Sequence, residues 1–465
     1  MEDLDLAFAG AARQAELIAA GEVSSLELTE LSLRRIEAVD ERINSFALSL
    51  ADSALEAAAA ADRRIAAGER APLLGVPVAI KDAVDIAGAP TARGSAAFPD
   101  PVDRDGDEVR RVREAGAVIV GKTTLPELAI CGFTETEAFG ASRNPWDPSR
   151  TCGGSSGGSG AAVAAGLVGV AGASDGAGSI RIPAACNGLF GIKPTNGLIP
   201  VEPAGHWTGM SSAGGLGRRV ADVALYCDVI APRPPDGAAS FSEGLSRDAS
   251  SLRIAVTESA PRTLVAALVT AEVSRAVEET AELLVSLGHE VHREDPDWGL
   301  AGQNLSTRYL AGIHSEVAGV EHRELLEART RGFARLGRLS PPFLVKRAIE
   351  AAKSDAERVD RIFDGADVLL CPTIGEPPVE VGRWGSTGAL RTLLGMARSL
   401  GHTAHWNHLG HPAASVPAGT TAEGLPLAVQ IVARHGREAD LIALAARIEA
   451  ARPWADRRPA LATGG

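Results

Sequence analysis

Several features that mark particular classes of protein are scarce or missing in this sequence. Basic residues are outnumbered, with 46 Lys and Arg against 59 Asp and Glu and a formal charge of −13. Nucleic acids and anionic membranes attract concentrated positive charge, so neither is expected as a partner. The five cysteines are scattered and odd in number, which argues against a disulfide framework and favours a reducing, cytoplasmic location.

Long apolar runs are missing as well. The most apolar window, residues 161–173, is too short and too rich in glycine to span a bilayer. The start of the chain, Met1-Glu2-Asp3, has no basic region followed by a long apolar core, so we expect no secretory signal. A cytoplasmic protein is the resulting expectation.

Lysine is the rarest cation. The chain has five lysines, at positions 81, 122, 193, 346 and 353, and every other basic residue is arginine. Arginine stays protonated in proteins, whereas a buried lysine can lose its proton and act as a base. A retained lysine is therefore a candidate for chemistry that arginine cannot perform.

What is present indicates a globular α/β protein, with 45% hydrophobic and 23% charged residues. Helices and short apolar strands alternate, which favours a sheet with helices on both faces. The pattern predicts helices after the Ser24/Glu27 capping box, over 53–67, over 109–114 and over 438–451, with helical stretches up to about 363. It predicts strands over 74–80, 118–120, 367–370 and 428–432, and a loop over 233–251. No repeat and no sharp break divides the chain.

Two motifs resemble known sites but lack the required context. Gly116 to Thr123 matches the phosphate-loop pattern, yet its centre, Ala-Val-Ile-Val, favours a strand. His402, His405, His408 and His411 recur every third residue, a period that suits neither a helix face nor a strand face for all four. With no carboxylate or Cys among them, a metal site is disfavoured, and we interpret them as the wall or rim of a pocket.

A compound motif points to nucleophilic catalysis. Gly153-Gly-Ser-Ser-Gly-Gly158 precedes Asp175-Gly-Ala-Gly-Ser-Ile-Arg181, and Lys81 lies upstream at the end of a predicted strand. Small residues before Ser179 leave backbone N–H groups free, as an oxyanion hole requires. A neutral, desolvated lysine can serve as the base that a serine nucleophile needs.

At these residues the sequence closely resembles the amidase signature family of serine hydrolases. The 24-residue separation of Ser155 and Ser179 also matches that family. The resemblance extends through residues 75–82, 143–146, 191–195 and 412–417, and so covers most of the chain. Ala177 departs from the pattern, since glycine is usual there, as do Asn196 and His411. These departures affect the expected substrate and not the reaction type.

The resemblance implies a Ser–cisSer–Lys triad. Ser179 matches the nucleophile, Ser155 the relay serine that follows a cis peptide bond, and Lys81 the base. The backbone of Gly176, Ala177, Gly178 and Ser179 matches the oxyanion hole, while Asp175 and Arg181 resemble scaffold residues. No cofactor and no metal are implied, and the substrate is a small-molecule amide that reacts with water.

The implied fold is α/β, a mixed central sheet covered by helices on both faces in a single large domain, commonly as a homodimer. The amidase domain spans 1–465, with a signature core at about 70–230 and a C-terminal half, about 252–455, that completes the sheet and the pocket. Three alternatives to an amidase stay open at this point. They are the glutaminase subunit of a tRNA-dependent amidotransferase, an esterase, and a non-catalytic relative that binds an amide.

Overall fold

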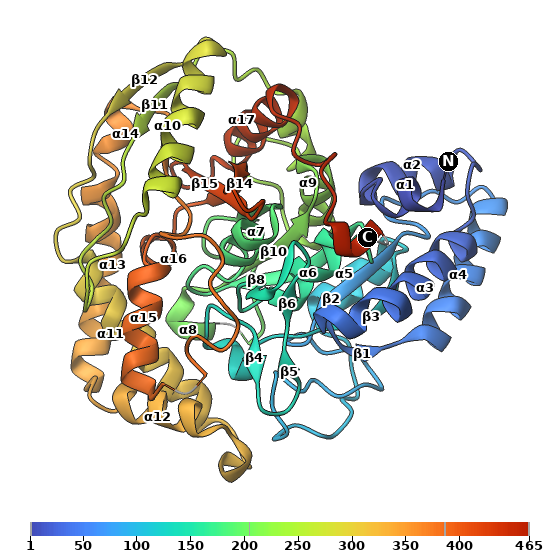
Figure 1. Ribbon diagram of the computed structural model, residues 1–465, viewed down its shortest axis with the longest axis horizontal. Coiled ribbons are helices and arrows are strands. Elements are labelled where there is room, and N and C mark those ends of the chain that lie inside the picture. The colour runs from blue at the N-terminus through green and yellow to red at the C-terminus, as the bar shows by residue number, and fades with distance from the viewer. Residues whose placement is uncertain (1, 204, 386, 464–465) are drawn as a thin grey trace.

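The framework of the protein is a sheet of eleven strands, seen in a computed structural model that describes residues 2–203, 205–385 and 387–463 (Figure 1). The strands lie in the order β1-β3-β2-β8-β10-β9-β14-β15-β13-β11-β12, with both parallel and antiparallel neighbours. Their bounds are β1 (Phe46–Ser49), β2 (Pro77–Lys81), β3 (Val118–Thr123), β8 (Val170–Asp175), β9 (Phe190–Lys193), β10 (Ser212–Gly217), β11 (Arg253–Val256), β12 (Glu290–Arg293), β13 (Val368–Pro372), β14 (Ala413–Thr420) and β15 (Pro426–Val432).

Helices cover both faces of this sheet. In β10, Gly215 faces Tyr226 and its neighbour Gly214 faces Ile180, so two different layers of side chains lie on opposite faces. The helices are α1 (Asp3–Ala7), α2 (Ala11–Ala19), α3 (Ser25–Ile43), α4 (Ala51–Ala66), α5 (Asp107–Glu114), α6 (Gly157–Ala164), α7 (Arg181–Asn187), α8 (His206–Gly209), α9 (Val220–Ile230), α10 (Ala271–Ser286), α11 (Ala301–Ala318), α12 (Ala328–Gly337), α13 (Pro342–Val359), α14 (Ile362–Gly365), α15 (Ala389–Ser399), α16 (Ala404–Leu409) and α17 (Glu438–Ala451). The predicted α/β class with a mixed sheet is confirmed.

Helices α3 and α4 form where the sequence predicts helices. Ser24 caps α3, and both hydrogen bonds of the capping box with Glu27 are present. The Ala-rich helix α4 buries Ala54, Ala58 and Ala61 against its neighbours. The predicted strand over 74–80 begins later, at Pro77, and includes Lys81 as its last residue.

The sequence pattern predicts none of the strands β1, β8, β9, β10, β11, β12 and β14. β10 has the sequence SAGGLG, which resembles a loop when read locally. A Cβ on Gly214 would lie 2.9 Å from the Ile180 side chain, and one on Gly215 would lie 3.0 Å from the Tyr226 ring. The glycines are therefore required by close packing on both faces. β11 and β12 lie in the stretch that was expected to be helical, and their parallel pairing with β13 and with each other is long-range.

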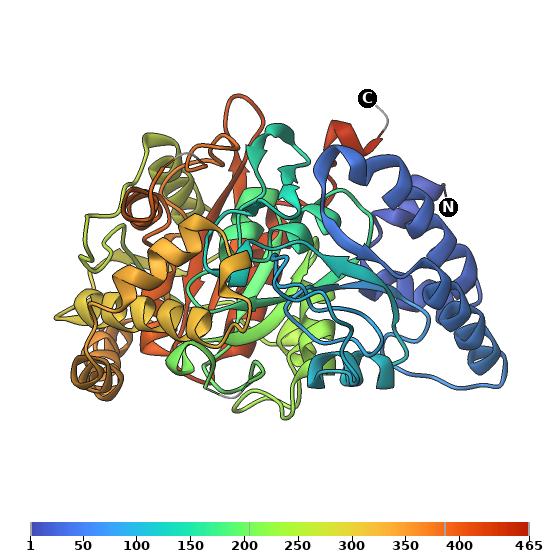
Figure 2. The same cartoon turned by 90° about the horizontal axis from the view of Figure 1, so that it is seen from below.

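The two halves of the chain share the sheet. β9 pairs with β14 in antiparallel register, with Ile192 opposite Ala414. Figures 1 and 2 show the N-terminal helices at one side of the molecule and α10 to α16 at the other, with the central strands between them. At the N-terminal side, Arg35 donates to the carbonyl of Ala462, which ties the end of the chain to α3. In the described part of the chain, every helix is too short or too polar to cross a membrane.

Candidate active site

Three neighbouring strands each have one terminus at the same end of the sheet. β2 and β8 run parallel and end there at Lys81 and Asp175, while β10 runs antiparallel and begins there, with Ser212 opposite Asp175. The strand order places β8 between β2 and β10. Residues far apart in the sequence therefore meet at this end, and the loop that follows β8 lies between them.

Lys81 is buried beneath two serines. Its Nζ atom lies 2.8 Å from Ser155 Oγ and 3.1 Å from Ser174 Oγ. Burial lowers the pKa of Lys81 to about 7, although the negative charges of Asp175 and Glu108 oppose the shift. A substantial fraction of this amine is therefore neutral near neutral pH and able to accept a proton.

Ser155 stands at the start of a turn that is held by close backbone contacts. The peptide bond between Gly154 and Ser155 is cis, in agreement with the resemblance. A Cβ on Gly154 would lie 2.7 Å from the backbone nitrogen of Phe133, and one on Gly158 would lie 2.5 Å from that of Thr124. The glycine-rich segment is thus backbone packed around a site and not a linker.

Ser179 lies in the loop between β8 and α7, beside the segment of Ser155. The Ser156 N–H donates to the carbonyl of Ser179 at 3.2 Å. The Gly178 N–H donates to Asp175 Oδ1 at 2.6 Å, so this donor is engaged inside the loop and differs from the expected free oxyanion donor. In the described structure the N–H groups of Gly176, Ala177 and Ser179 have no such partner.

The loop is held from below by a buried polar network. Arg181 pairs with Asp175 at 2.9 Å and donates to Gln430 and Asn407. Asn407 in turn donates to the backbone carbonyl of Asp175 at 2.9 Å. Burial alone would raise the pKa of Asp175, but the charge and hydrogen bonds of Arg181 and Asn407 hold it well below its usual range. Asp175 and Arg181 are thus scaffold residues of this loop.

A cavity opens above these residues. Its polar lining consists of Ser155, Ser174, Ser179, His206, Ser211, Thr263 and Ser306. Its apolar lining includes Ile130, Ile182, Trp207, Leu264, Leu305, Tyr309, Leu310, Leu393, Met396 and Leu400. The described lining contains no Asp, Glu, Lys or Arg. Apart from Ser155 and Ser179, these residues had no sequence signal, because they come from separate loops and helices that only the fold brings together.

The interpretation of the four histidines as wall or rim of a pocket is wrong. Gly401 and Ala404 of the same segment line the cavity, while the histidine side chains point into the protein. His408 contacts Asp355 at 2.9 Å, and His411 contacts Asp360 at 2.7 Å. Both carboxylates come from α13 or its end, about 50 residues away, so no local pattern could reveal them. Burial lowers the pKa of His408 and of His411 to about 4.

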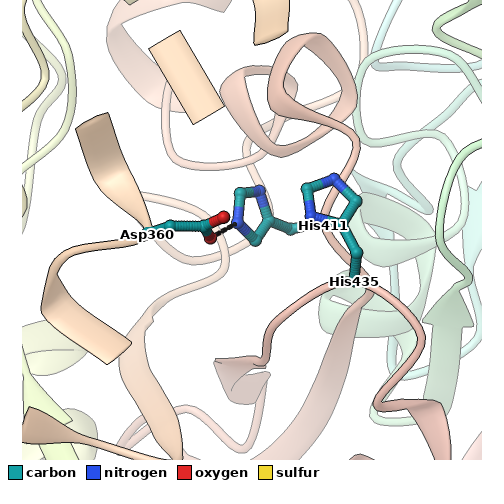
Figure 3. A group of neighbouring side chains, drawn as sticks. All are labelled: Asp360, His411 and His435. Carbon is teal, nitrogen blue, oxygen red and sulfur yellow. Dashed lines mark hydrogen bonds and ion pairs between the residues drawn. The ribbon is translucent and has the colours of Figure 1, made fainter. Parts of the chain in front are cut away.

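Within the described residues, one group of side chains has the donor types and spacing to hold a metal ion. Asp360, His411 and His435 have ligand atoms that all lie within 4.8 Å of one another (Figure 3). His411 forms a hydrogen bond with Asp360, and His435 Nε2 lies 3.0 Å from the carbonyl oxygen of Leu409. None of the three lines the cavity, so this group lies apart from Ser179.

The other lysines have structural surroundings. The segment Gly116 to Thr123 contains β3 and not a phosphate loop, as its apolar centre predicts. Lys122 forms a buried ion pair with Asp82 at 2.7 Å. Lys193 donates to the carbonyl of Pro194 at 2.6 Å and does not line the cavity. Of the buried lysines, Lys81 is the one that contacts cavity serines.

Comparison with known proteins gives a consistent result. A family model described as Amidase matches residues 27–442. A protein of Mycobacterium tuberculosis assigned as the amidase AmiB2 is 45% identical over 99% of this chain and 100% of its own length. The 6-aminohexanoate-cyclic-dimer hydrolase of Pseudomonas sp. is 34% identical over 99% of this chain and 98% of its own. A solved structure of a 6-aminohexanoate cyclic dimer hydrolase with substrate superposes with a TM-score of 0.87 at 32% identity, covering 98% of this chain and 99% of that one.

Proposed function

This chain belongs to the amidase family and hydrolyses carbon–nitrogen amide bonds, and we propose that the reaction passes through an acyl-enzyme on Ser179. The observation that carries this proposal is the contact of Lys81 Nζ with Ser155 Oγ at 2.8 Å, directly beneath the cavity that Ser179 lines. A buried lysine with a pKa of about 7 is suited to act as a base near neutral pH.

In the first half of the reaction, neutral Lys81 accepts the proton of Ser155 while Ser155 accepts the proton of Ser179. The Ser179 Oγ atom attacks the amide carbon, and negative charge develops on the carbonyl oxygen. The free N–H groups of Gly176, Ala177 and Ser179 are the donors that support this charge. The lysine carries the proton as an ammonium group at the end of this step.

In the second half, the proton returns from Lys81 through Ser155 to the substrate nitrogen. The carbon–nitrogen bond then breaks, the amine or ammonia leaves, and the acyl group stays on Ser179. Water attacks this ester with the same base, and the carboxylic acid is released. Each proton that Lys81 takes is returned, so no external acid or cofactor is needed in this scheme.

The lining of the cavity favours a neutral amide with an apolar body. No acidic or basic side chain occurs among its described residues, and burial lowers the pKa of His206 to about 4, so this imidazole is neutral at physiological pH. Glutamine carries an ammonium and a carboxylate, each of which needs a partner when it is desolvated. The glutaminase alternative is therefore disfavoured on electrostatic grounds.

The proposal is tested by replacing the nucleophile. Ser179→Ala removes one hydroxyl, and we expect it to abolish hydrolysis and to prevent labelling by a fluorophosphonate that reacts with active-site serines. Ser306→Ala is the matched control, because Ser306 lines the same cavity and its hydroxyl donates to the carbonyl of Gly302. Labelling of Ser179→Ala at a different active-site serine would refute the assignment.

Wild-type activity is also expected to persist in a chelator.

The location and assembly of the protein are also proposals. Cys131, Cys152, Cys186, Cys227 and Cys371 are all buried free thiols, which suits a reducing cytoplasm. The homodimer that the resemblance implies is tested by light scattering on the purified chain, with a mass near twice 47.9 kDa as the expected result. A mass of one chain across the working concentration range would contradict it.

A further inference from the structure

A second group of polar side chains reaches the cavity, made of the hydrogen-bonded pair His206 and Ser211 and of Glu316 behind it. His206 Nδ1 lies 2.8 Å from Ser211 Oγ, and His206 Nε2 lies 3.3 Å from Glu316 Oε1. Ser211 and His206 line the cavity, whereas Glu316, on α11, stands behind the imidazole. The proposed acyl-transfer scheme makes no use of these three side chains.

The order of these groups determines which way the Ser211 hydroxyl points. The negative charge of the Glu316 carboxylate, 3.3 Å from Nε2, favours the neutral tautomer of His206 that carries its proton on Nε2. Nδ1 is then an acceptor, and the hydroxyl proton of Ser211 is directed to it. The oxygen of Ser211 consequently offers its lone pairs, and not a proton, to whatever occupies the cavity.

The position of Ser211 is rigidly defined. It directly precedes β10. Because Ser212 of β10 pairs with Asp175 of antiparallel β8, Ser211 lies opposite Gly176. A Cβ on Gly176 would lie 3.0 Å from Ser211 Oγ. Asn407 fastens the two segments together, because its amide donates to the carbonyls of both Asp175 and Met210.

The segment before Ser211 carries backbone strain. Trp207 and Thr208 have φ values of 49° and 57°, in the left-handed region that non-glycine residues rarely adopt. Trp207 is held there by an edge-on contact with Tyr309, with ring centroids 5.0 Å apart. Such conformations persist where the surroundings impose them and are concentrated at functional sites.

We propose that Ser211 accepts the hydrogen of the scissile amide N–H and is a specificity determinant for amides over esters. The inference rests on the proposed function. After attack by Ser179, the lone pair of the nitrogen must face Ser155 to receive the proton. The N–H is then turned away from Ser155, toward the other side of β8, where Ser211 presents its acceptor oxygen. An ester has no hydrogen at this position and gains nothing from Ser211.

The experiment compares two substrates with the same acyl group, hexanoyl 4-nitroanilide and 4-nitrophenyl hexanoate. We expect Ser211→Ala to lower kcat/KM for the anilide about tenfold and to leave the ester within about twofold. Glu316→Ala should shift the anilide-to-ester ratio in the same direction, because it removes the negative charge that favours a proton on His206 Nε2. Ser211→Thr keeps the hydroxyl and should retain the wild-type ratio.

The controls separate this inference from the proposed function. Ser306→Ala deletes another cavity hydroxyl and should leave the ratio unchanged. Fluorophosphonate labelling of Ser179 in each variant reports an intact site independently of turnover. An equal fall on both substrates in Ser211→Ala, or no fall on the anilide, overturns the role of Ser211. Ester or anilide hydrolysis that survives Ser179→Ala overturns the nucleophile instead.

Discussion

Lys81 shows at the residue scale how burial changes the chemistry of a side chain. The same ammonium group on the exposed part of α13, at Lys346 or Lys353, only forms loose ion pairs at 3.8 Å and 3.9 Å. At the end of β2 it is removed from water, and desolvation lowers its pKa to about 7. The scarcity of lysine in the sequence makes this position a candidate base without knowledge of its surroundings.

The pH dependence of activity tests the role of Lys81 as a base. The neutral amine is the active form, so wild-type activity is expected to rise with pH through an ionisation at about 7 and to fall on acidification. Lys81→Ala should lose about 10²–10⁴-fold in activity, which is the usual contribution of a general base. The residual activity of Lys81→Ala should lack the acidic limb. Rate profiles on one amide across pH 5–9 measure both effects.

Lys81→Arg is the control that separates charge from basicity. A guanidinium keeps the positive charge but cannot release its proton near neutral pH. If Lys81 is the base, arginine at this position is as damaging as alanine. Activity within about tenfold of wild type in Lys81→Arg would mean that the lysine acts through its charge. The assignment of Lys81 as the general base would then be wrong.

At the scale of elements, the loop between β8 and α7 depends on the ion pair of Asp175 and Arg181. Asp175 accepts from Gly178, Ile180 and Arg181, and so shapes the loop that carries Ser179. Both side chains of the ion pair are fully buried. Removal of one charge therefore leaves the other uncompensated in the interior.

Asp175→Asn is expected to destabilise the protein by about 3–5 kcal/mol, measured by urea unfolding, and to lower the rate of Ser179 labelling. Glu16→Gln is the matched control, because it breaks an ion pair with Arg13 whose side chains are 66% and 48% exposed. Such a surface pair contributes about 0–1 kcal/mol. Comparable losses in the two variants would contradict the scaffold role of Asp175.

Elements that depend on local pattern were predicted better than those that depend on partners. The final helix, α17, has the predicted bounds Glu438–Ala451, since its periodicity and its acidic first turn are local signals. β10 has two adjacent glycines and no apolar alternation. It is a strand because β8 and β9 pair with it on either side, and no window of sequence contains that information.

At the scale of the whole molecule, the sheet joins segments that are distant in the sequence. The division proposed from the sequence, a core at about 70–230 and a C-terminal half at about 252–455, falls within this sheet. β9 belongs to the first segment and pairs with β14 of the second. Separation of the halves would expose the edge of β9 that pairs with β14.

We therefore expect the chain to unfold as one unit and its N-terminal part to fail to fold alone. A fragment of residues 1–250 should give no cooperative thermal transition and no labelling at Ser179. The full chain should show a single urea transition when followed by both tryptophan fluorescence and circular dichroism. Coincident, cooperative unfolding of the isolated fragment would show that the first half is an independent domain.

The sequence by itself determined the reaction class and the candidate triad. Lys81, Ser155 and Ser179 stand in short motifs whose glycines and small residues are required by backbone contacts. Each of the three can therefore be recognised from a short stretch of sequence. The tertiary structure decided the partners of the histidines, the contact of Asn407 with Asp175 and the lining of the cavity. These depend on which strands and helices lie side by side. The contacts join residues about 50 to more than 200 positions apart, a distance over which no local sequence pattern reports.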